Sequence, residues 1–315
     1  MATCGFQFAS RAESDKPALL GYPWMELRPQ SMQPLCQAPL ISARFLVTAG
    51  TCVTLDGNGL ALIFVELEEH NRFTKKDCEL IKGETISSPP VQKLAVEKYI
   101  LHPDYDVSNQ TTTTSARLGE YDKNSMTDCV DIDGQRICSP PVQSLSIESL
   151  IVHSGFNKPR YANDIALIRL RVRADLSRSN VKPICLPVTN ELRSQKPSQY
   201  ILTAWSSGSG GNVLERSISQ LTESVECQKL YTEQSVTLEK TSRQICIKQQ
   251  QESGTRCKFP ASAAPLQLLQ PVNGQQRYVL YGLLSYGPKS CSVLYPDVYT
   301  NVASYIDWIL DNIHE

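Results

Sequence analysis

The sequence predicts an all-β protein, a sandwich or barrel, that ends in one amphipathic helix. Short runs rich in β-branched and aromatic residues recur along its 315 residues, separated by Pro, Gly, Asn and Ser, as is typical of many-stranded β folds. The clearest strands are expected at 45–49, 60–65, 165–170, 200–205 and 278–284. The helix is indicated by apolar residues at helical spacing after the N-cap residue Asn301, with Trp308 and Ile313 flanking that face; they are Val302, Tyr305, Ile306, Ile309 and Leu310.

Composition and charge exclude several functional classes. Lys and Arg number 31 against 32 Asp and Glu, so the net charge of -1 provides no general attraction to nucleic acid or to acidic membranes. Hydrophobic residues make up 41% and charged residues 20%, which is unlike a disordered chain. The longest apolar run, 60–65, is far shorter than the roughly 20 residues of a membrane span. We therefore expect a soluble globular protein with no nucleic-acid or membrane partner.

The eleven cysteines favour an extracellular protein with disulfides. Eleven is odd, so at least one cysteine has no internal partner if the others pair. The residues after Met1 lack the basic and apolar regions of a secretory signal, and we interpret this start as that of a truncated gene product. The alternative is a cytosolic protein with free thiols that binds metal, but the chain shows no C-x2-C or His-x3-5-His spacing. No metal and no cofactor are expected.

A tandem duplication is the most unusual feature of the sequence. Residues 65–109, called copy one below, match residues 116–160, called copy two, at 16 of 45 positions with a constant offset of 51. Two copies are too few for a solenoid, so a duplication inside one domain is the better interpretation. The polar run 108–115 joins the copies and contains the N-x-S/T sequon at Asn109, a glycosylation site if the chain is secreted.

Four separated segments resemble those of trypsin-like serine proteases, in the family's order. Residues 46–52 resemble L-T-A-A-H-C around the catalytic histidine, and residues 163–167 are N-D-I-A-L, as around the catalytic aspartate. Residues 260–265 stand in the place of G-D-S-G-G-P, and 296–302 resemble P-G-V-Y-T-x-V. The resemblance implies two six-stranded antiparallel Greek-key barrels with the active site in the cleft between them, followed by a C-terminal helix.

More narrowly, the chain is similar to arthropod clip-domain serine proteases and their inactive homologues. The features that carry this are the Cys4-Gly5 opening and the segments 119–122, 128–129, 138–141 and 181–187. The resemblance implies a leader at 1–19 and a protease domain at 20–313. Within that domain it implies a first barrel at about 20–180, a second at about 186–301 and the helix at about 302–313.

The resemblance places the catalytic triad at Thr51, Asp164 and Ser262. The base of such a triad must accept the serine proton and pass it to the leaving group. Threonine cannot do this near neutral pH, so Ser262 is expected to remain an ordinary alcohol. None of the four histidines, His70, His102, His153 and His314, lies in a motif that would bring it to this place.

Two further parts of the machinery are altered. Pro260 replaces the glycine whose N–H forms half of the oxyanion hole, and proline has no N–H. Activating cleavage would fall between Arg11 and Ala12, but the aspartate that should receive the new terminus is Ala261. A buried ammonium would then have no partner, so we expect no activation by cleavage.

The specificity pocket retains its outline. The resemblance places Thr255 at its base, Ser285, Tyr286 and Gly287 on its wall, and Asp297 where a glycine is usual. Asp297 has two interpretations: it binds a basic side chain, or, as we favour, its carboxylate fills a collapsed pocket.

The resemblance also implies a disulfide pattern. The pairs are Cys4–Cys185, Cys36–Cys52, Cys129–Cys138, Cys227–Cys246 and Cys257–Cys291. Cys78 is left unpaired, because Ser87 stands at the place in copy one that Cys138 has in copy two. A free thiol or an intermolecular bridge is expected there.

The leading functional hypothesis is a secreted, non-catalytic homologue that acts as a cofactor or regulator in an extracellular protease cascade of arthropod immunity and melanization. Its expected partners are proteases, prophenoloxidase or other homologues. The alternatives are an active trypsin-like endopeptidase and a decaying gene without a folded product. We further expect copy two to pair with the strand at Ile165, because it has both cysteines and leads directly into Asn163-Asp164.

Overall fold

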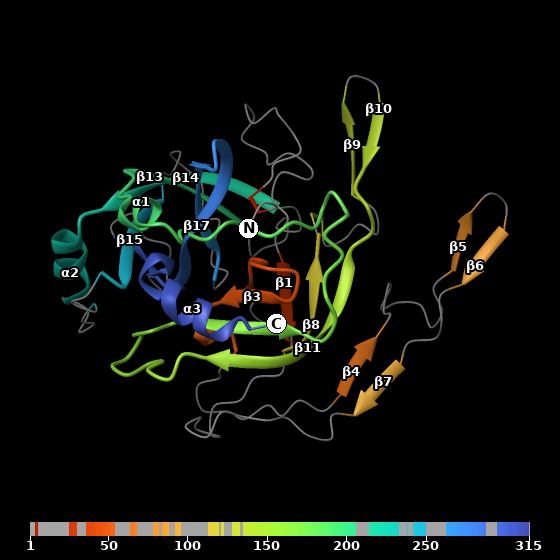
Figure 1. Cartoon of the computed structure of the whole chain (residues 1–315), viewed down its shortest axis with the longest axis horizontal. Helices are drawn as coiled ribbons and strands as arrows, with labels where there is room; N and C mark the ends of the chain where they lie inside the picture. The colour runs from red at the N-terminus through yellow and green to blue at the C-terminus, as the bar shows by residue number, and fades with distance from the viewer. Residues whose placement is uncertain are drawn as a thin grey trace.

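The structure is a computed structural model of the whole chain. It describes residues 4–5, 25–29, 36–53, 64–67, 78–81, 84–87, 92–95, 113–119, 121–122, 128–132, 135–205, 214–232, 238, 242–249, 263–287 and 295–314. These residues form mainly antiparallel strands with a few short helices (Figure 1). The predicted all-β class with a C-terminal helix is confirmed.

The first half of the fold is a six-stranded antiparallel sheet. Its order is β2 (Cys36–Gln37), β1 (Met25–Pro29), β8 (Thr113–Leu118), β11 (Gln143–Val152), β12 (Ala166–Leu170) and β3 (Phe45–Thr48). Apolar side chains from alternate positions of these strands form one core cluster, which includes Leu46, Leu118, Ile168 and Leu170. Strands that are distant in the sequence are thus held together by the burial of their apolar faces.

The second half is a closed six-stranded barrel. Around the barrel the strands are β13 (Gln199–Trp205), β14 (Leu214–Thr222), β15 (Gln244–Gln249), β18 (Asp297–Asn301), β17 (Gln275–Tyr286) and β16 (Pro265–Val272). Each of these six described strands pairs with a neighbour on both sides, so closure leaves none of them at an open edge. Its interior is filled by a cluster that includes Leu202, Ile247, Leu266 and Tyr299.

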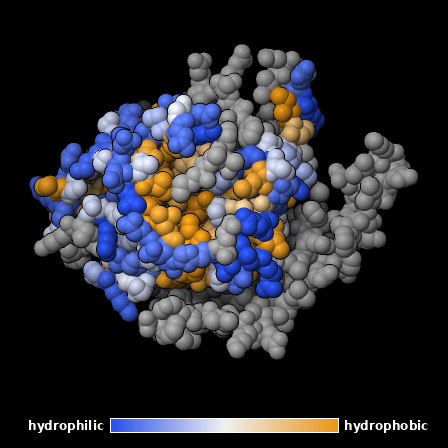
Figure 2. All heavy atoms as spheres, viewed as in Figure 1, coloured by the Kyte–Doolittle hydropathy of each residue, from blue (hydrophilic) through white to orange (hydrophobic). Residues whose placement is uncertain are grey.

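A third apolar cluster joins the two sheets to the end of the chain. Val47 and Leu167 come from the first sheet, Ile165 directly precedes β12, and Leu280 and Leu283 come from β17. Figure 2 shows apolar side chains gathered near the centre of the viewed face, with polar side chains around them. The cluster fixes the two sheets against each other, and Thr51 and Asp164 lie in segments next to this contact.

The C-terminal helix is largely as predicted. A 3₁₀ turn at Val302–Tyr305 leads into α3 (Ile306–Asn312), and the Asn301 side chain caps it by accepting the N–H of Ala303 at 3.2 Å. The expected apolar face is wrong at Leu310, which is 36% exposed because it lies at the rim of the buried stripe centred on Ile306 and Ile309.

Two other helices were not predicted from the sequence. They are α1 (Asn190–Ser194), whose N-cap Thr189 accepts the N–H of Leu192, and α2 (Ser224–Thr232). Both are short and lack a strong apolar period, so pattern reasoning had little to detect.

The duplication is visible as a repeated set of hairpins. In copy one, β4 (Phe64–Leu67) pairs with β7 (Gln92–Ala95), and β5 (Cys78–Ile81) pairs with β6 (Glu84–Ser87). In copy two, β8 pairs with β11, and β9 (Cys129–Ile132) pairs with β10 (Gln135–Cys138). Every pair of opposed residues in copy one recurs in copy two at an offset of 51.

Copy two occupies the first sheet, as expected. Its β11 pairs with β12, and its β8 pairs with β1. Within the described residues, β4 and β7 pair only with each other, and Figure 1 shows β5 and β6 far from both sheets. The duplication therefore adds a second strand unit outside the first sheet.

Four disulfides join the described cysteines in the pattern that the resemblance implied. They are Cys4–Cys185, Cys36–Cys52, Cys129–Cys138 and Cys227–Cys246, with Cα–Cα distances of 4.9, 5.8, 4.0 and 6.3 Å. Cys257 and Cys291 lie outside the described residues, and for Cys78 only the backbone in β5 is described. Closing loops in this way stabilises the folded chain, more so for long loops such as that of Cys4–Cys185.

Candidate functional site

Thr51 is held in a short turn at the end of β3. The 3₁₀ turn Gly50–Cys52 is closed by backbone hydrogen bonds from Cys52 to Ala49 and from Val53 to Gly50, each 3.0 Å long. The Cys36–Cys52 disulfide ties the turn to β2. Thr51 itself is exposed, whereas its neighbours on both sides are buried, so only this residue of the turn faces outward.

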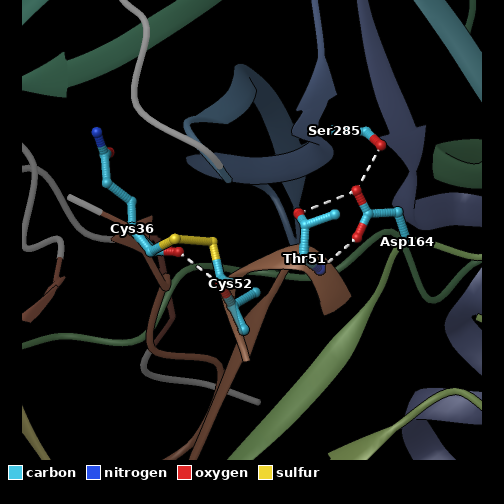
Figure 3. Close-up of a disulfide and its surroundings, with 7 residues drawn as sticks. Cys36, Thr51, Cys52, Asp164 and Ser285 are labelled. Carbon is cyan, nitrogen blue, oxygen red and sulfur yellow. Dashed lines mark hydrogen bonds between the residues drawn. A yellow bond between two sulfur atoms is a disulfide. The ribbon is translucent and has the colours of Figure 1, made fainter. Parts of the chain in front are cut away.

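Asp164 lies just before β12 and is almost completely buried, at 1% exposure. Its carboxylate accepts the Thr51 backbone N–H at 2.8 Å, the Thr51 hydroxyl at 3.3 Å and the Ser285 hydroxyl at 2.5 Å (Figure 3). Its backbone carbonyl accepts the Thr300 hydroxyl at 2.7 Å. The structure thus brings two of the three expected triad positions, Thr51 and Asp164, into direct contact.

The electrostatic state of Asp164 follows from this burial. Desolvation raises its pKa from 3.8 to about 6, and the hydrogen bonds from Ser285 and Thr51 reduce the shift without cancelling it. In a Ser-His-Asp triad the aspartate orients the histidine and stabilises its charged form. The side chain that Thr51 presents to Asp164 is an uncharged hydroxyl that carries no basic nitrogen.

His153 is held by a different part of the fold. Its Nδ1 accepts the Gly155 N–H at 3.1 Å, and its ring contacts Tyr305 and Trp308 at centroid distances of 5.5 and 5.3 Å. Burial, and then the charge of Arg243, lower its pKa. These contacts anchor the ring against the C-terminal helix. His70 and His102 lie outside the described residues, and His314 is exposed near the end of the chain.

The segment that should carry the nucleophile is only partly described. Pro260, Ala261 and Ser262 lie outside the described residues, as do Thr255, Arg11, Ala12 and Asn109. Ala263, the next described residue, is fully buried and has φ 60°. Its N–H donates to the carbonyl of Leu284 at 2.8 Å. The residue after Ser262 therefore adopts a left-handed conformation that favours glycine.

The wall of the expected pocket is formed by the end of β17. Ser285 turns its hydroxyl to Asp164, and the Tyr286 ring stacks on Tyr161 with a centroid distance of 4.4 Å. A Cβ at Gly287 would lie 2.2 Å from Asp297 Oδ1, so this carboxylate lies directly against the glycine backbone. Asp297 therefore occupies space beside the wall that a glycine in its place would leave open.

Three contacts of this site were not anticipated from the sequence. Ser285 was assigned to the pocket wall, yet its hydroxyl donates to Asp164. Tyr161 stacks on Tyr286. The sequence places Tyr161 three residues before Asp164 but gives no other signal for this contact. The Phe156 ring covers Gly50 so closely that a Cβ there would lie 2.7 Å from a ring carbon. Such contacts between distant segments leave no periodic signal in the sequence.

Among the described residues, no group of three or more His, Cys, Asp or Glu side chains is placed to hold a metal ion. No helix in the described part of the chain combines the length and the hydrophobicity needed to cross a membrane.

Comparison with known proteins gives a consistent result. Residues 122–309, more than half of the chain, match the family described as Trypsin. CLIP domain-containing serine protease B9 of Anopheles gambiae is 32% identical over 64% of this chain and 48% of its own length. Melanization protease 1 of Drosophila melanogaster is 31% identical over 69% of this chain and 56% of its own length.

The fold is also similar to a solved structure. The crystal structure of the Drosophila Grass clip serine protease of the Toll pathway matches 98% of this chain and 74% of that chain, with a TM-score of 0.68 and 23% identity. This likeness bears on the fold alone. The chain spans about half the length of the curated relatives that it matches.

Proposed function

Because the chain belongs to the trypsin family of serine proteases, we propose that it is a non-catalytic homologue that binds and regulates other proteins of an extracellular protease cascade. The observation that carries the proposal is the contact between Thr51 and Asp164. A threonine in the turn Gly50–Cys52 lies beside the buried carboxylate and donates both its N–H and its O–H to it.

The chemistry of this contact argues against turnover. Removing the base of a Ser-His-Asp unit costs about 10⁶ in rate, and the effects of damage within one unit are not additive. A threonine hydroxyl cannot take a proton from Ser262 near pH 7. Pro260, which lacks an N–H, removes one of the two usual oxyanion donors, a loss of about 10² to 10³ on its own. Either change alone would leave a poor catalyst.

The specificity pocket supports the same conclusion. The Asp297 carboxylate lies against Gly287, and Tyr286 is stacked on Tyr161. A substrate side chain would have to displace a carboxylate that already occupies this space, and a peptide running along the wall would meet paired rings. We interpret Asp297 as filling the pocket rather than as a receptor for a basic side chain.

The relatives support a place in a protease cascade. One is named a melanization protease, and another is a CLIP domain-containing serine protease. Four disulfides among the described cysteines are typical of an extracellular protein. We infer from these features that the chain acts in arthropod immunity and melanization, with proteases, prophenoloxidase or other homologues as partners.

An active endopeptidase is the second candidate function. It is favoured by the retained Asp164 and Ser262 and by relatives that are named serine proteases. The two candidates differ in whether Ser262 is nucleophilic, and this property can be measured directly.

The deciding experiment is labelling with a fluorophosphonate probe. The purified chain is cleaved after Arg11, incubated with the probe and compared with Ser262→Ala and with an active trypsin. We expect labelling of the chain to equal that of Ser262→Ala. Robust labelling that Ser262→Ala abolishes would overturn the non-catalytic proposal and favour the endopeptidase.

A second experiment tests the cofactor role. The purified chain is added to an active clip-domain protease and prophenoloxidase, and phenoloxidase activity is measured against the same mixture without it. We expect the chain to change the rate or yield of activation. Equal activity at every concentration of the chain would remove prophenoloxidase activation from the proposal.

A further inference from the structure

Because the strand pair is duplicated, two segments of the chain could supply the strands between β1 and β12. We call the position between β1 and β12 in the first sheet the slot. We infer that the slot is a binding surface for the two strands of either copy. Copy one, which is part of the same chain, fits the slot less well and is excluded from it by residues at the end of its first strand. The slot is occupied by β8 and β11 of copy two, which pair on their outer sides with β1 and β12.

Chain topology does not decide between the copies. With copy two in the sheet, the extra residues form one insertion between β3 and β8. With copy one in the sheet, an insertion of the same length would lie between the copy-one strands and β12. The internal pairing of the two strands is identical in both copies, because each opposed pair in β4 and β7 recurs in β8 and β11. The side chains of the two copies must therefore determine which copy lies between β1 and β12.

The second strand of copy one would fit the slot. In copy two, Gln143 exchanges two hydrogen bonds with the Asp175 backbone at 2.9 and 3.0 Å. Glu148 forms ion pairs with Arg44 at 2.8 Å and with Arg169 at 3.2 Å. At an offset of 51, copy one has the same two residues, Gln92 and Glu97, and it also has leucine where copy two has Leu145. The contacts that anchor β11 are thus available to both copies.

The first strand of copy one would not fit, and the sharpest conflict is at Gly119. This glycine has φ 80°, and a Cβ on it would lie 2.4 Å from Asn180 Nδ2. Asn180 is 3% exposed, and the same Nδ2 donates to the carbonyls of Gly119 and Pro140 at 3.2 and 2.8 Å. Copy one has Glu68 at this place. A side chain there meets both an unfavourable backbone conformation and a buried amide that cannot move without losing its bonds.

Two neighbouring positions add to the conflict. Ala116 is fully buried in the core of the first sheet, and copy one has the larger Val65 in its place. Arg117 lies near Asp128, where its charge partly opposes the rise in pKa that burial causes. Copy one has Glu66 there, which would place a like charge beside the equivalent acid, Asp77. All three conflicts lie within four residues of one strand end.

The inference predicts rescue at a distance. Gly119→Glu transfers the copy-one conflict to copy two, so neither copy fits, and the cooperative thermal transition should be lost or shifted strongly downward. Adding Val65→Ala, Glu66→Arg and Glu68→Gly removes the conflicts from copy one. The combined variant should regain a cooperative transition, with copy one in the sheet.

Limited proteolysis with mass spectrometry shows which copy lies in the first sheet, because the copy outside it should be cut first. In the wild type the first cuts should fall within copy one, and in the combined variant they should move to copy two. The matched control combines Gly119→Glu with Glu69→Gly, which alters a position identical in both copies and should rescue nothing. The inference is overturned if Gly119→Glu alone folds normally, if the control rescues as well as the combined variant, or if the combined variant stays unfolded or folds with copy two protected.

A further variant keeps the test decisive even if Gly119→Glu only aggregates. The three copy-one substitutions in the wild-type background leave Gly119 intact, so this protein should fold. Proteolysis should then give fragments of both arrangements. Protection of copy two alone, unchanged from the wild type, would contradict the inference.

Discussion

The buried carboxylate of Asp164 should lower the stability of the fold at neutral pH, because none of its described hydrogen-bond donors carries a positive charge. Its pKa is about 6 in the folded chain, against an ordinary value of 3.8, with burial as the main cause. Below pH 3.8 the group is neutral in both states. As the pH rises from 4 to above 6, the unfolded chain loses this proton first, so stability contributed by the protonated group is progressively lost.

The size of the loss follows from the shift. Two pKa units at about 1.36 kcal/mol each give roughly 3 kcal/mol lower stability at pH 7.5 than at pH 3.5 from this group alone. Asp164→Asn removes the charge while leaving an oxygen to accept the Thr51 N–H. We therefore expect this variant to be more stable than the wild type at pH 7.5 by up to roughly 3 kcal/mol, with the difference vanishing near pH 4.

The assay is denaturant unfolding of both proteins between pH 4 and 8. Asp175→Asn is a suitable control, since Asp175 is exposed and hydrogen bonds from Ser177 lower its pKa. That group contributes stability above its unfolded pKa, so its removal should not stabilise the protein at neutral pH. If Asp164→Asn were destabilised at pH 7.5, or if its advantage did not depend on pH, the account of Asp164 as an uncompensated charge would be refuted.

Three other outcomes can be checked. Ser87→Cys should form a disulfide with Cys78, because the two face each other in the register of Cys129 and Cys138; a thiol titration should find one free thiol fewer than in the wild type, and persistence of both thiols would contradict the register. Thr51→His should not restore fluorophosphonate labelling, because Pro260 still lacks an oxyanion N–H; labelling above Ser262→Ala would show that the histidine alone was missing. Leu167→Ala should cost about 2–5 kcal/mol in thermal or denaturant unfolding, since Leu167 is fully buried between the sheets; a cost below that of the half-exposed Leu269→Ala would mean that the two sheets are not held there.

The fold could be predicted because its signals are local and ordered. The short β-branched runs at 45–49, 165–170, 200–205 and 278–284 predicted β3, β12, β13 and β17, whereas most of the run at 60–65 lies outside the described residues. Asn301 with the following apolar stripe predicted the C-terminal helix. The duplication was visible because its offset is constant, and the greater completeness of copy two correctly indicated which copy pairs with β12. The short helices α1 and α2 were missed because neither has an apolar period long enough to detect.

The site could be predicted only as far as residue positions. Motif order placed Thr51 and Asp164 together, and the structure shows their contact. The partners that complete the arrangement could not be foreseen, because they depend on packing between distant segments. The Ser285 hydroxyl on Asp164, the Phe156 ring over Gly50 and the stacking of Tyr161 on Tyr286 are of this kind.

The Cys4–Cys185 bond has a consequence for the molecule after proteolysis. Cys4 is bonded to Cys185 in the segment that joins the two sheets, and Gly5 forms backbone hydrogen bonds with Pro183 in that segment and with Tyr278 in β17 of the barrel. A cut after Arg11 would therefore yield two polypeptides that migrate together without reductant and separate with it. The polypeptide before the cut would stay covalently attached to Cys185, so cleavage at Arg11 would create two new chain ends without releasing a fragment.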